Sequence, residues 1–170
     1  FRPSYLKIVD FIKRLPKRPV VSAFTATATA EVRDDIIDIL MLQEPEVLTT
    51  GFDRTNLYFG VQTPKDRYQA LVELLEQHKS ESGIVYCLTR KIVEEVCEKL
   101  IKEGFSVTRY HAGLSDAERK HNQEEFIYDN VRIMVATNAF GMGIDKSNVR
   151  FVIHYNMPKN MESYYQEAGR

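Results

Sequence analysis

The sequence contains no long apolar run. No stretch approaches the ~20 residues that a membrane-spanning helix needs, and the opening FRPSYLKIVDFIKRLPKRP has neither the apolar core nor the cleavage site of a signal peptide. Apolar residues make up 44% of the chain and charged residues 28%, which is typical of a soluble globular protein of about one domain. We therefore exclude membrane and disordered proteins and expect a cytosolic or nuclear location.

Cysteine is scarce. Cys87 and Cys97 are the only two, and their spacing fits neither a disulfide framework nor a metal-binding CxxC motif. We expect two buried, reduced thiols. No set of cysteine, histidine and carboxylate residues has metal-binding spacing, so the sequence predicts no metal site.

Neither sign of charge dominates. The formal net charge of -1 conceals an uneven distribution, because residues 1–20 hold six Lys or Arg against Asp10 alone, whereas residues 31–46 hold six Asp or Glu against Arg33 alone. The overall balance therefore says little about nucleic-acid binding.

The first part of the chain predicts helices and short strands. Apolar residues recur at helical spacing over residues 5–15, and Pro16 ends this amphipathic helix. Residues 20–24 and 47–50 are predicted strands, and a helix over residues 29–40 is predicted between them.

After residue 51, strands and helices alternate. This pattern is typical of right-handed βαβ crossovers and predicts an α/β fold whose parallel sheet carries helices on both faces. We place the domain boundary near residues 51–56, and we see no repeat or low-complexity tract. The predicted strands are 57–62, 83–87, 106–110, 131–136 and 150–155, and the predicted helices run from Thr63 to about His78, up to Gly104, from a capping box at Ser115 and Glu118, and from Asn160.

In a parallel sheet of this kind, the ligand site lies at the carboxyl ends of the strands. Thr89 and Arg90 follow one strand there, at a helix N-terminus that favours a phosphate group. An ordinary cap followed by a surface arginine would look the same. His111 and Gly113 follow the next strand and could face a phosphodiester, although a single histidine at a strand end is more often structural.

The stretch TNAFGMGIDK at residues 137–146 is the most informative. Its glycines let the backbone approach a ligand, Thr137 and Asn138 offer hydrogen bonds, and Asp145 could accept one from a ribose hydroxyl. The alternative is a plain glycine-rich loop. A Rossmann dinucleotide site is disfavoured, because the third glycine is missing and a strand follows in place of a helix.

Two further stretches have a functional and a structural interpretation. The hydroxyls of SAFTATAT at residues 22–29 could relay contacts between a nucleotide site and a second domain, or could only cap the next helix. The last residues, QEAGR, place Arg170 at the same sheet edge as the glycine loop, either as a ligand contact or as a solvated helix-end charge.

The chain closely resembles RecQ-family DNA helicases in several motifs that occur in the family's order. The resemblance covers nearly all of the chain and implies two RecA-like (P-loop NTPase-type) domains with ATP between them, a single-stranded DNA track across both and 3′-to-5′ translocation. It implies that residues 1–51 end the first domain and that residues 52–170 form a second one that stops within the sixth motif. The matching stretches are FRPSYL, SAFTATAT, GIVYCLTR, YHAGL, VATNAFGMGIDK and VRFVIHYNMPKNMESYYQEAGR.

The resemblance also implies partners, cofactors and residue roles. Single-stranded and branched DNA are the implied partners, and ATP with Mg²⁺ is the implied cofactor. By this resemblance, nucleic-acid contacts fall on Thr25, Thr27, Thr89, Arg90, His111, Gly113, Thr137 and Asn138, nucleotide contacts on Gly141, Gly143, Asp145, Gly169 and Arg170, and catalytic roles on Gln166 and Arg170.

The sequence departs from the family pattern in several places. Phe24, Thr29 and Thr55 stand where a leucine, an acidic residue and a proline are common. The chain has no GxxxxGK[ST] phosphate loop, no DExH box, no aromatic-rich loop and no zinc subdomain, and it stops before the second arginine of GRAGR. We therefore expect the chain alone to be inactive, ATP and Mg²⁺ to bind mainly through residues outside it, and Arg170 to be a supporting contact in place of the main arginine finger.

Two other functions are compatible with these motifs. One is an RNA-directed helicase of the wider superfamily, which the wording GMGIDK and YYQEAGR disfavours. The other is a non-catalytic nucleic-acid-binding or interaction domain that has kept the fold and lost the motor. A GxxxxGK[ST] loop and a DExH box in the preceding coding sequence would favour the enzyme.

Overall fold

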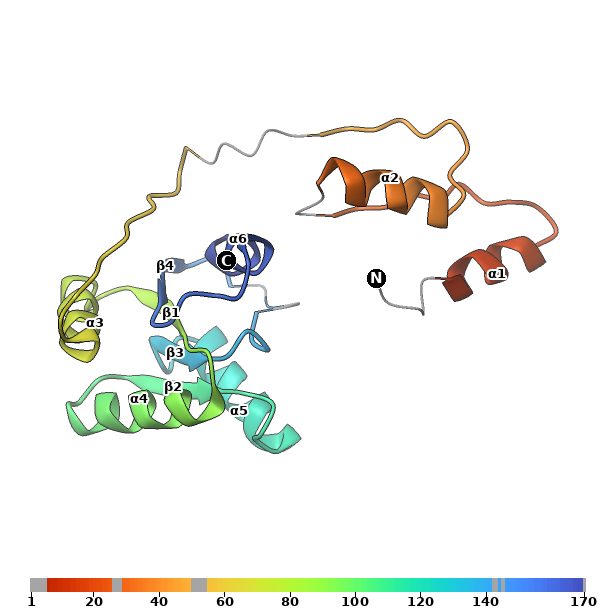
Figure 1. Ribbon diagram of the computed structural model, residues 1–170. Helices are drawn as coiled ribbons and strands as arrows, with labels where there is room; N and C mark the ends of the chain where they lie inside the picture. The colour runs from red at the N-terminus through yellow and green to blue at the C-terminus, as the bar shows by residue number, and fades with distance from the viewer. Residues whose placement is uncertain (1–5, 26–28, 50–54, 142–143, 145, 170) are drawn as a thin grey trace. The chain divides into compact units, whose positions relative to one another are not determined.

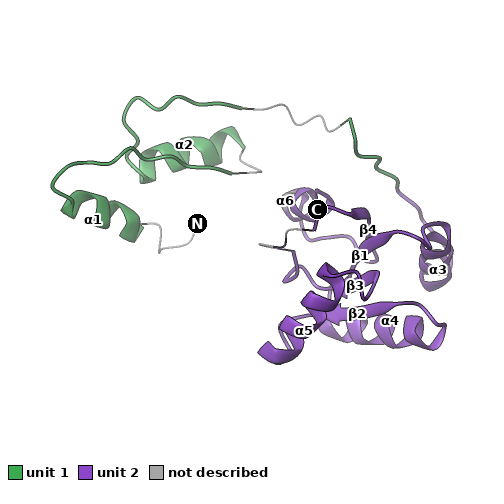
Figure 2. Cartoon of the chain, turned by 180° about the vertical axis from the view of Figure 1, so that it is seen from behind, with its two compact units in different colours: residues 1–60 green, residues 61–170 purple. Residues whose placement is uncertain are grey.

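The chain divides into two compact units, Phe1–Gly60 and Val61–Arg170, which Figure 2 distinguishes by colour. This division lies further along the chain than the boundary near residues 51–56 that the sequence indicates. The structure, a computed structural model, describes residues 6–25, 29–49, 55–141, 144 and 146–169.

The first unit contains helices α1 (Leu6–Arg14) and α2 (Ala30–Ile39), which Figure 1 shows. The apolar stripe of α1 buries Val9 and Ile12. Thr29 caps α2, because its hydroxyl accepts a hydrogen bond from a backbone N–H of the first turn at 3.3 Å. Both predicted helices are confirmed.

The predicted strands of this part of the chain are wrong. The described residues of 20–24, 47–50 and 57–62 contain no strand, and the side chains of Val20 and Phe24 are 96% and 95% exposed. A strand is stable only when its backbone N–H and C=O groups pair with a neighbouring strand. The described residues of the first unit offer no such neighbour, so apolar composition alone does not produce a strand here.

The second unit is built on a four-stranded parallel sheet in the order β2-β3-β1-β4. The two central strands, β1 and β3, are buried along their whole length. Parallel neighbours need crossover connections, and helices provide them. The predicted parallel α/β fold is confirmed. Its strands are β1 (Ser82–Tyr86), β2 (Val107–Tyr110), β3 (Ile133–Ala136) and β4 (Val149–His154).

Helices cover both faces of this sheet (Figure 1). They are α3 (Arg67–Gln77), α4 (Arg90–Lys102), α5 (Asp116–Ile127) and α6 (Met161–Ala168). On one face, Val85 of β1 packs in a core with Leu71 of α3 and with apolar residues of α4. On the other, Tyr86 packs with Phe126 of α5 and stacks on His154 of β4, which bonds to α6. Successive side chains of a strand point to opposite faces, so Val85 and Tyr86 belong to different cores. None of the described helices is long and apolar enough to cross a membrane.

Local sequence signals place most helix ends. Ser115 and Glu118 form the predicted capping box, in which each side chain accepts a hydrogen bond from the other residue's backbone N–H. Gly104 follows α4 with a φ of +86°, a conformation that favours glycine. The helix predicted from Thr63 begins later, because Asp66 caps α3 by accepting hydrogen bonds from two backbone N–H groups.

The two thiols lie in the core. Cys87 and Cys97 are 4% and 1% exposed and form no disulfide, which confirms the prediction of buried, reduced thiols. Burial raises the pKa of Cys87 to about 12 and the pKa of Cys97 to about 11. Both thiols are therefore protonated and unreactive at neutral pH.

Gly83 of β1 lies against an aromatic ring of the neighbouring strand. A Cβ atom at Gly83 would stand 2.2 Å from the Phe151 ring of β4. We expect Gly83→Ala to lower the free energy of unfolding by about 1–3 kcal/mol, because an extra atom in a packed core forces its neighbours out of their rotamers. Urea unfolding followed by circular dichroism measures the change, with Ser80→Ala at an exposed position as the control. Equal stability of Gly83→Ala and the wild type would contradict this packing.

Candidate functional site at the carboxyl edge of the sheet

The four strands end at one level, which brings the loops that follow them together. Tyr86 ends β1 beside Ala136 of β3 and His154 of β4, and Tyr110 ends β2 beside the same Ala136. Backbone pairing continues past this level, since the N–H of Cys87 donates to the carbonyl of Ala136 at 2.8 Å. The loops therefore share the edge at which open parallel sheets bind ligands.

Thr89 and Arg90 stand at the start of α4, directly after β1. The Thr89 hydroxyl accepts a hydrogen bond from the N–H of Ile92 at 3.2 Å, so it caps the helix. Arg90 is exposed, and its Cδ lies 3.2 Å from the place that a Cβ of Gly113 would take on the next loop. The guanidinium group thus stands at the surface, beside a helix N-terminus that favours an anion.

His111 is buried at the end of β2, and both ring nitrogens form hydrogen bonds. Nδ1 accepts from the N–H of Gly113 at 3.1 Å, which assigns the ring proton to Nε2, and Nε2 donates to the Glu94 carboxylate at 2.6 Å. Glu94 also accepts from Arg109 at 2.9 Å. The imidazole therefore shapes the loop from beneath, and the exposed part of the loop includes the backbone of Gly113.

The loop after β3 begins with a buried threonine and turns at a glycine. Thr137 is 9% exposed, whereas Asn138 is exposed. Phe140 packs into the core beneath the loop, and its N–H donates to the carbonyl of Thr137 at 3.0 Å. Gly141 has a φ of +118°, which few other residues adopt without strain. The loop therefore needs a glycine at this position.

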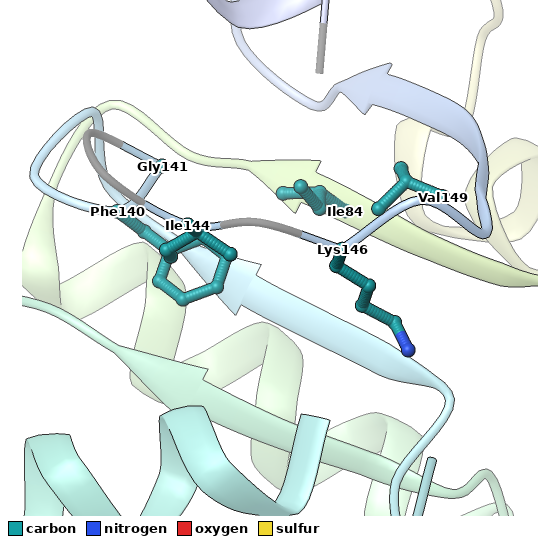
Figure 3. A pocket seen from close by; sticks show the side chains of 6 residues that line it. All are labelled: Ile84, Phe140, Gly141, Ile144, Lys146 and Val149. Carbon is teal, nitrogen blue, oxygen red and sulfur yellow. The ribbon is translucent and has the colours of Figure 1, made fainter. Parts of the chain in front are cut away.

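A small cavity lies under the glycine loop, as Figure 3 shows. Its volume is about 30 Å³, which is room for a few water molecules and far too little for a nucleotide. The cavity belongs to the packing between the loop and the sheet. It is lined by Ile84, Phe140, Gly141, Ile144, Lys146 and Val149.

Lys146 ties the far end of the loop to the turn before β3. Its side chain is 2% exposed, and its ammonium group donates to Asp129 at 2.7 Å and lies 5.0 Å from the centre of the Phe126 ring. Asn148 and Ser82 donate to the same carboxylate at 3.0 and 3.2 Å. These hydrogen bonds, first of all the one from Lys146, hold the pKa of Asp129 below its usual value.

Helix α6 carries the last motif and is anchored by a buried pair. Asn160 caps its start. Glu167 points inward and meets Nε2 of His154 in β4 at 2.9 Å, with each side chain 9% exposed. Gln166 is exposed beside it, and Gly169 is exposed at the C-terminal end of the helix.

Six of the predicted nucleic-acid-binding residues lie at this edge, directly after β1, β2 or β3. They are Thr89, Arg90, His111, Gly113, Thr137 and Asn138. The same unit holds Gly141, Gln166 and Gly169, which the sequence predicts on the nucleotide side, whereas Thr25 is exposed in the first unit. The predicted residues that lie outside the described part of the chain are Thr27, Gly143, Asp145 and Arg170.

The sequence placed Asn156 at this edge but did not indicate the contacts that hold these loops in place. Asn156, after β4, accepts a hydrogen bond from the N–H of Leu88, after β1, at 3.2 Å. Glu94, Asp129 and Glu167 each bond to a partner from a distant segment. An acidic residue on the inward side of a helix, as at Glu167, was an available signal. The spacing of residues along the chain did not indicate that His154 is the partner of Glu167.

Comparison with known proteins identifies the family of the second unit. Residues 66–170 match the helicase conserved C-terminal domain. The chain belongs to this family. Over its whole length, the chain is 49% identical to the ATP-dependent DNA helicase RecQ of Bacillus subtilis (strain 168), of which it spans 29%. It is 44% identical to the ATP-dependent DNA helicase RecQ of Pasteurella multocida (strain Pm70), of which it spans 27%. The predicted resemblance to RecQ helicases is confirmed, and the chain spans less than a third of these relatives.

The fold of the chain is also similar to that of a solved structure. The match is Saccharomyces cerevisiae Dbp5 bound to RNA and ADP BeF3, with a TM-score of 0.73 and 25% identity, over 96% of this chain and 44% of that one. Together with the parallel sheet, this similarity confirms the predicted RecA-like α/β fold.

Replacement of Asp129 should lower stability near neutral pH but not in acid. A carboxyl whose pKa in the folded state lies below the unfolded value of about 3.9 stabilises the fold above that pH, and this contribution is lost as the pH falls through the folded pKa. We expect Asp129→Asn to unfold at a lower temperature than the wild type near pH 7, with a difference that shrinks toward pH 2. Thermal unfolding across this range measures the difference, with Glu98→Gln at an exposed position as the control. A difference that stays constant in acid would contradict the ion pair with Lys146.

Proposed function

We propose that the chain is part of an ATP-dependent DNA helicase that couples ATP hydrolysis to 3′-to-5′ translocation on single-stranded DNA and to duplex unwinding. In this proposal, residues 1–51 end a first RecA-like domain and residues 52–170 form most of a second. Single-stranded and branched DNA are its substrates. The observation that carries the proposal is the position of Arg90, Gly113 and Asn138, each in the segment after a different strand, at the carboxyl edge of a helicase domain similar to RecQ.

The edge suits the sugar–phosphate backbone of a single strand. Arg90 offers a fork of N–H donors that matches a phosphate, next to the positive end of α4. Gly113 and Asn138 are exposed, and the absence of a side chain on Gly113 lets a strand come close. His111 contributes by holding the Gly113 backbone. Backbone contacts do not read base sequence, which is what a motor that moves along any DNA requires.

The nucleotide side of the proposal rests on the glycine loop and α6. The left-handed backbone of Gly141 lets the loop approach a ligand, and α6 presents Gln166 and leads through Gly169 toward Arg170. In this arrangement the second unit contacts one side of the nucleotide, and residues outside this chain contact the other side. We propose that Gly141, Gly143, Asp145, Gly169 and Arg170 contact the nucleotide and that Gln166 and Arg170 assist hydrolysis.

The remaining contacts to ATP and Mg²⁺ come from outside this chain in the proposal. The sequence has no GxxxxGK[ST] loop to cradle phosphates and no DExH box to hold Mg²⁺ and position water. The bound ATP supplies the phosphoanhydride bond whose hydrolysis drives the motor. The 170-residue chain alone is therefore expected to show no DNA-stimulated ATPase activity.

An RNA-directed helicase is the second candidate, because the similar Dbp5 structure is bound to RNA. The relatives with the higher identities of 49% and 44% are named DNA helicases, which favours DNA. Competition between single-stranded DNA and RNA of equal length for the complete protein separates the two candidates. A complete protein without ATPase activity would favour a non-catalytic binding module.

Arg90→Ala tests the DNA side of the edge in the complete protein. We expect weaker binding of single-stranded DNA of every sequence and a salt dependence of log K that is flatter by roughly one unit of slope, because one phosphate contact is lost. Fluorescence anisotropy titrations at several salt concentrations measure both effects. Arg150→Ala, at an exposed arginine near the opposite end of β4, is the matched control. An unchanged slope for Arg90→Ala would assign Arg90 to the solvated surface.

Arg170→Ala tests the nucleotide side. Groups that the second domain adds when the domains close around ATP act more on hydrolysis than on first capture of the nucleotide. We expect DNA-stimulated kcat to fall at least roughly tenfold, about 1.4 kcal/mol, with a smaller change in ATP affinity. Asp145→Ala should act in the same direction but more weakly, if it holds a ribose hydroxyl. Wild-type turnover of folded Arg170→Ala would show that this arginine is only a helix-end charge.

A further inference from the structure

A buried carboxylate and imidazole join α6 to the sheet. Glu167 and His154 meet at 2.9 Å, and each side chain is 9% exposed. Replacement of such a buried pair by apolar residues of similar volume is often neutral or stabilising in proteins, because two polar groups must lose their water to form the contact. A hydrogen bond adds direction, since it forms at only one register of α6 along β4. The pair therefore points to a requirement for position more than for stability.

The same imidazole touches two aromatic rings. The centre of the His154 ring lies 5.7 Å from that of Tyr86 in a stacked arrangement and 5.0 Å from that of Tyr164 in α6. Tyr86 and His154 are also register partners in the sheet. The histidine is thus fixed by the strand beside it and by the helix above it.

Tyr86 carries the connection onward to the glycine loop. Its buried hydroxyl donates to the carbonyl of Phe140 at 3.1 Å. Phe140 immediately precedes Gly141, where the backbone turns with a φ of +118°. A continuous line of contacts therefore runs from Glu167 through His154 and Tyr86 to the start of the glycine loop.

We propose that Glu167, His154 and Tyr86 are positioning residues that hold α6 and the glycine loop in one fixed arrangement, so that the two nucleotide-facing segments move as one body. This inference rests on the proposed function for the meaning of "nucleotide-facing". Glu167 stands next to Gln166 and shortly before Gly169 and Arg170 in the chain. A shift of α6 by part of a turn would displace these residues relative to the loop, and misplacement of about 1 Å is costly in catalysis.

The test uses Glu167→Leu and Glu167→Gln in the complete protein. The amide of glutamine can donate to or accept from either tautomer of His154, whereas leucine can do neither. Amide hydrogen exchange, measured without nucleotide, should be faster in Glu167→Leu both in α6 and in residues 137–141, and should stay near wild type in Glu167→Gln. Glu98→Leu, the same replacement at an exposed position of α4, is the matched control.

Turnover gives the second readout. We expect Glu167→Leu to lower DNA-stimulated kcat about tenfold, equal to about 1.4 kcal/mol, while the affinities for ATP and single-stranded DNA stay within about twofold. Tyr86→Phe keeps the ring and removes only the hydroxyl. It should speed exchange in residues 137–141 but not in α6, and lower kcat about threefold, as the loss of one hydrogen bond implies.

Specific outcomes would overturn the proposal. They are unchanged exchange in residues 137–141 for folded Glu167→Leu, equal damage by the glutamine and leucine replacements, and wild-type exchange in residues 137–141 for Tyr86→Phe. If Glu167→Leu does not fold, amide hydrogen exchange in Tyr86→Phe and Glu167→Gln tests the proposal in its place. Absence of ATPase activity in the wild-type complete protein would overturn the proposed function and leave the exchange test of the positioning line intact.

Discussion

β1 pairs with a parallel strand on each side, and the rest of the second unit depends on this pairing. Its residues are buried on both faces between β3 and β4, so the strand leaves no room for exposed polar side chains along its length. The polar residues that chemistry needs are displaced to the loops. Because the strands run in one direction and end at one level, all these loops open on the same side.

Three carboxylates hold those segments in place by hydrogen bonds to side chains that face the interior. Glu94 bonds to the imidazole behind the loop after β2, Asp129 to the ammonium group at the end of the glycine loop, and Glu167 to the histidine beneath α6. A hydrogen bond to a charged group is stronger than one between neutral groups, and loss of a carboxylate would remove this bond from a side chain, His111, Lys146 or His154, that has little contact with solvent. Each carboxylate thus stabilises one loop conformation and leaves the outer surface of the loop available for a ligand.

How well the sequence predicted a feature depended on how far apart in the chain the interacting residues lie. The capping box at Ser115 and the helix end at Gly104 depend on residues a few positions apart, and both were predicted correctly. The sheet of the second unit was also predictable, because buried strands of a βαβ fold leave a strong apolar pattern. The strand expected at residues 20–24 failed, because a strand requires a pairing partner that local sequence cannot specify.

The candidate site shows the same limit. The polar residues at strand ends, such as Arg90 and Asn138, could be predicted because parallel topology alone brings strand ends together. The burial of His111 and its bond to Glu94 could not, since they depend on how α4 lies against β2 in three dimensions. The hydrogen bond of Asn156 could not be predicted for the same reason, since its partner Leu88 follows a different strand.

The protonated state of the two core thiols has a practical consequence. Maleimide and similar reagents attack thiolates, whereas burial raises the pKa of Cys87 to about 12 and that of Cys97 to about 11 and leaves little of either residue exposed. A third cysteine introduced on an exposed loop would therefore react far faster than either native one. Fluorophores or spin labels could be attached to this chain without first replacing its own cysteines. Distances between its two units could then be followed in solution by energy transfer.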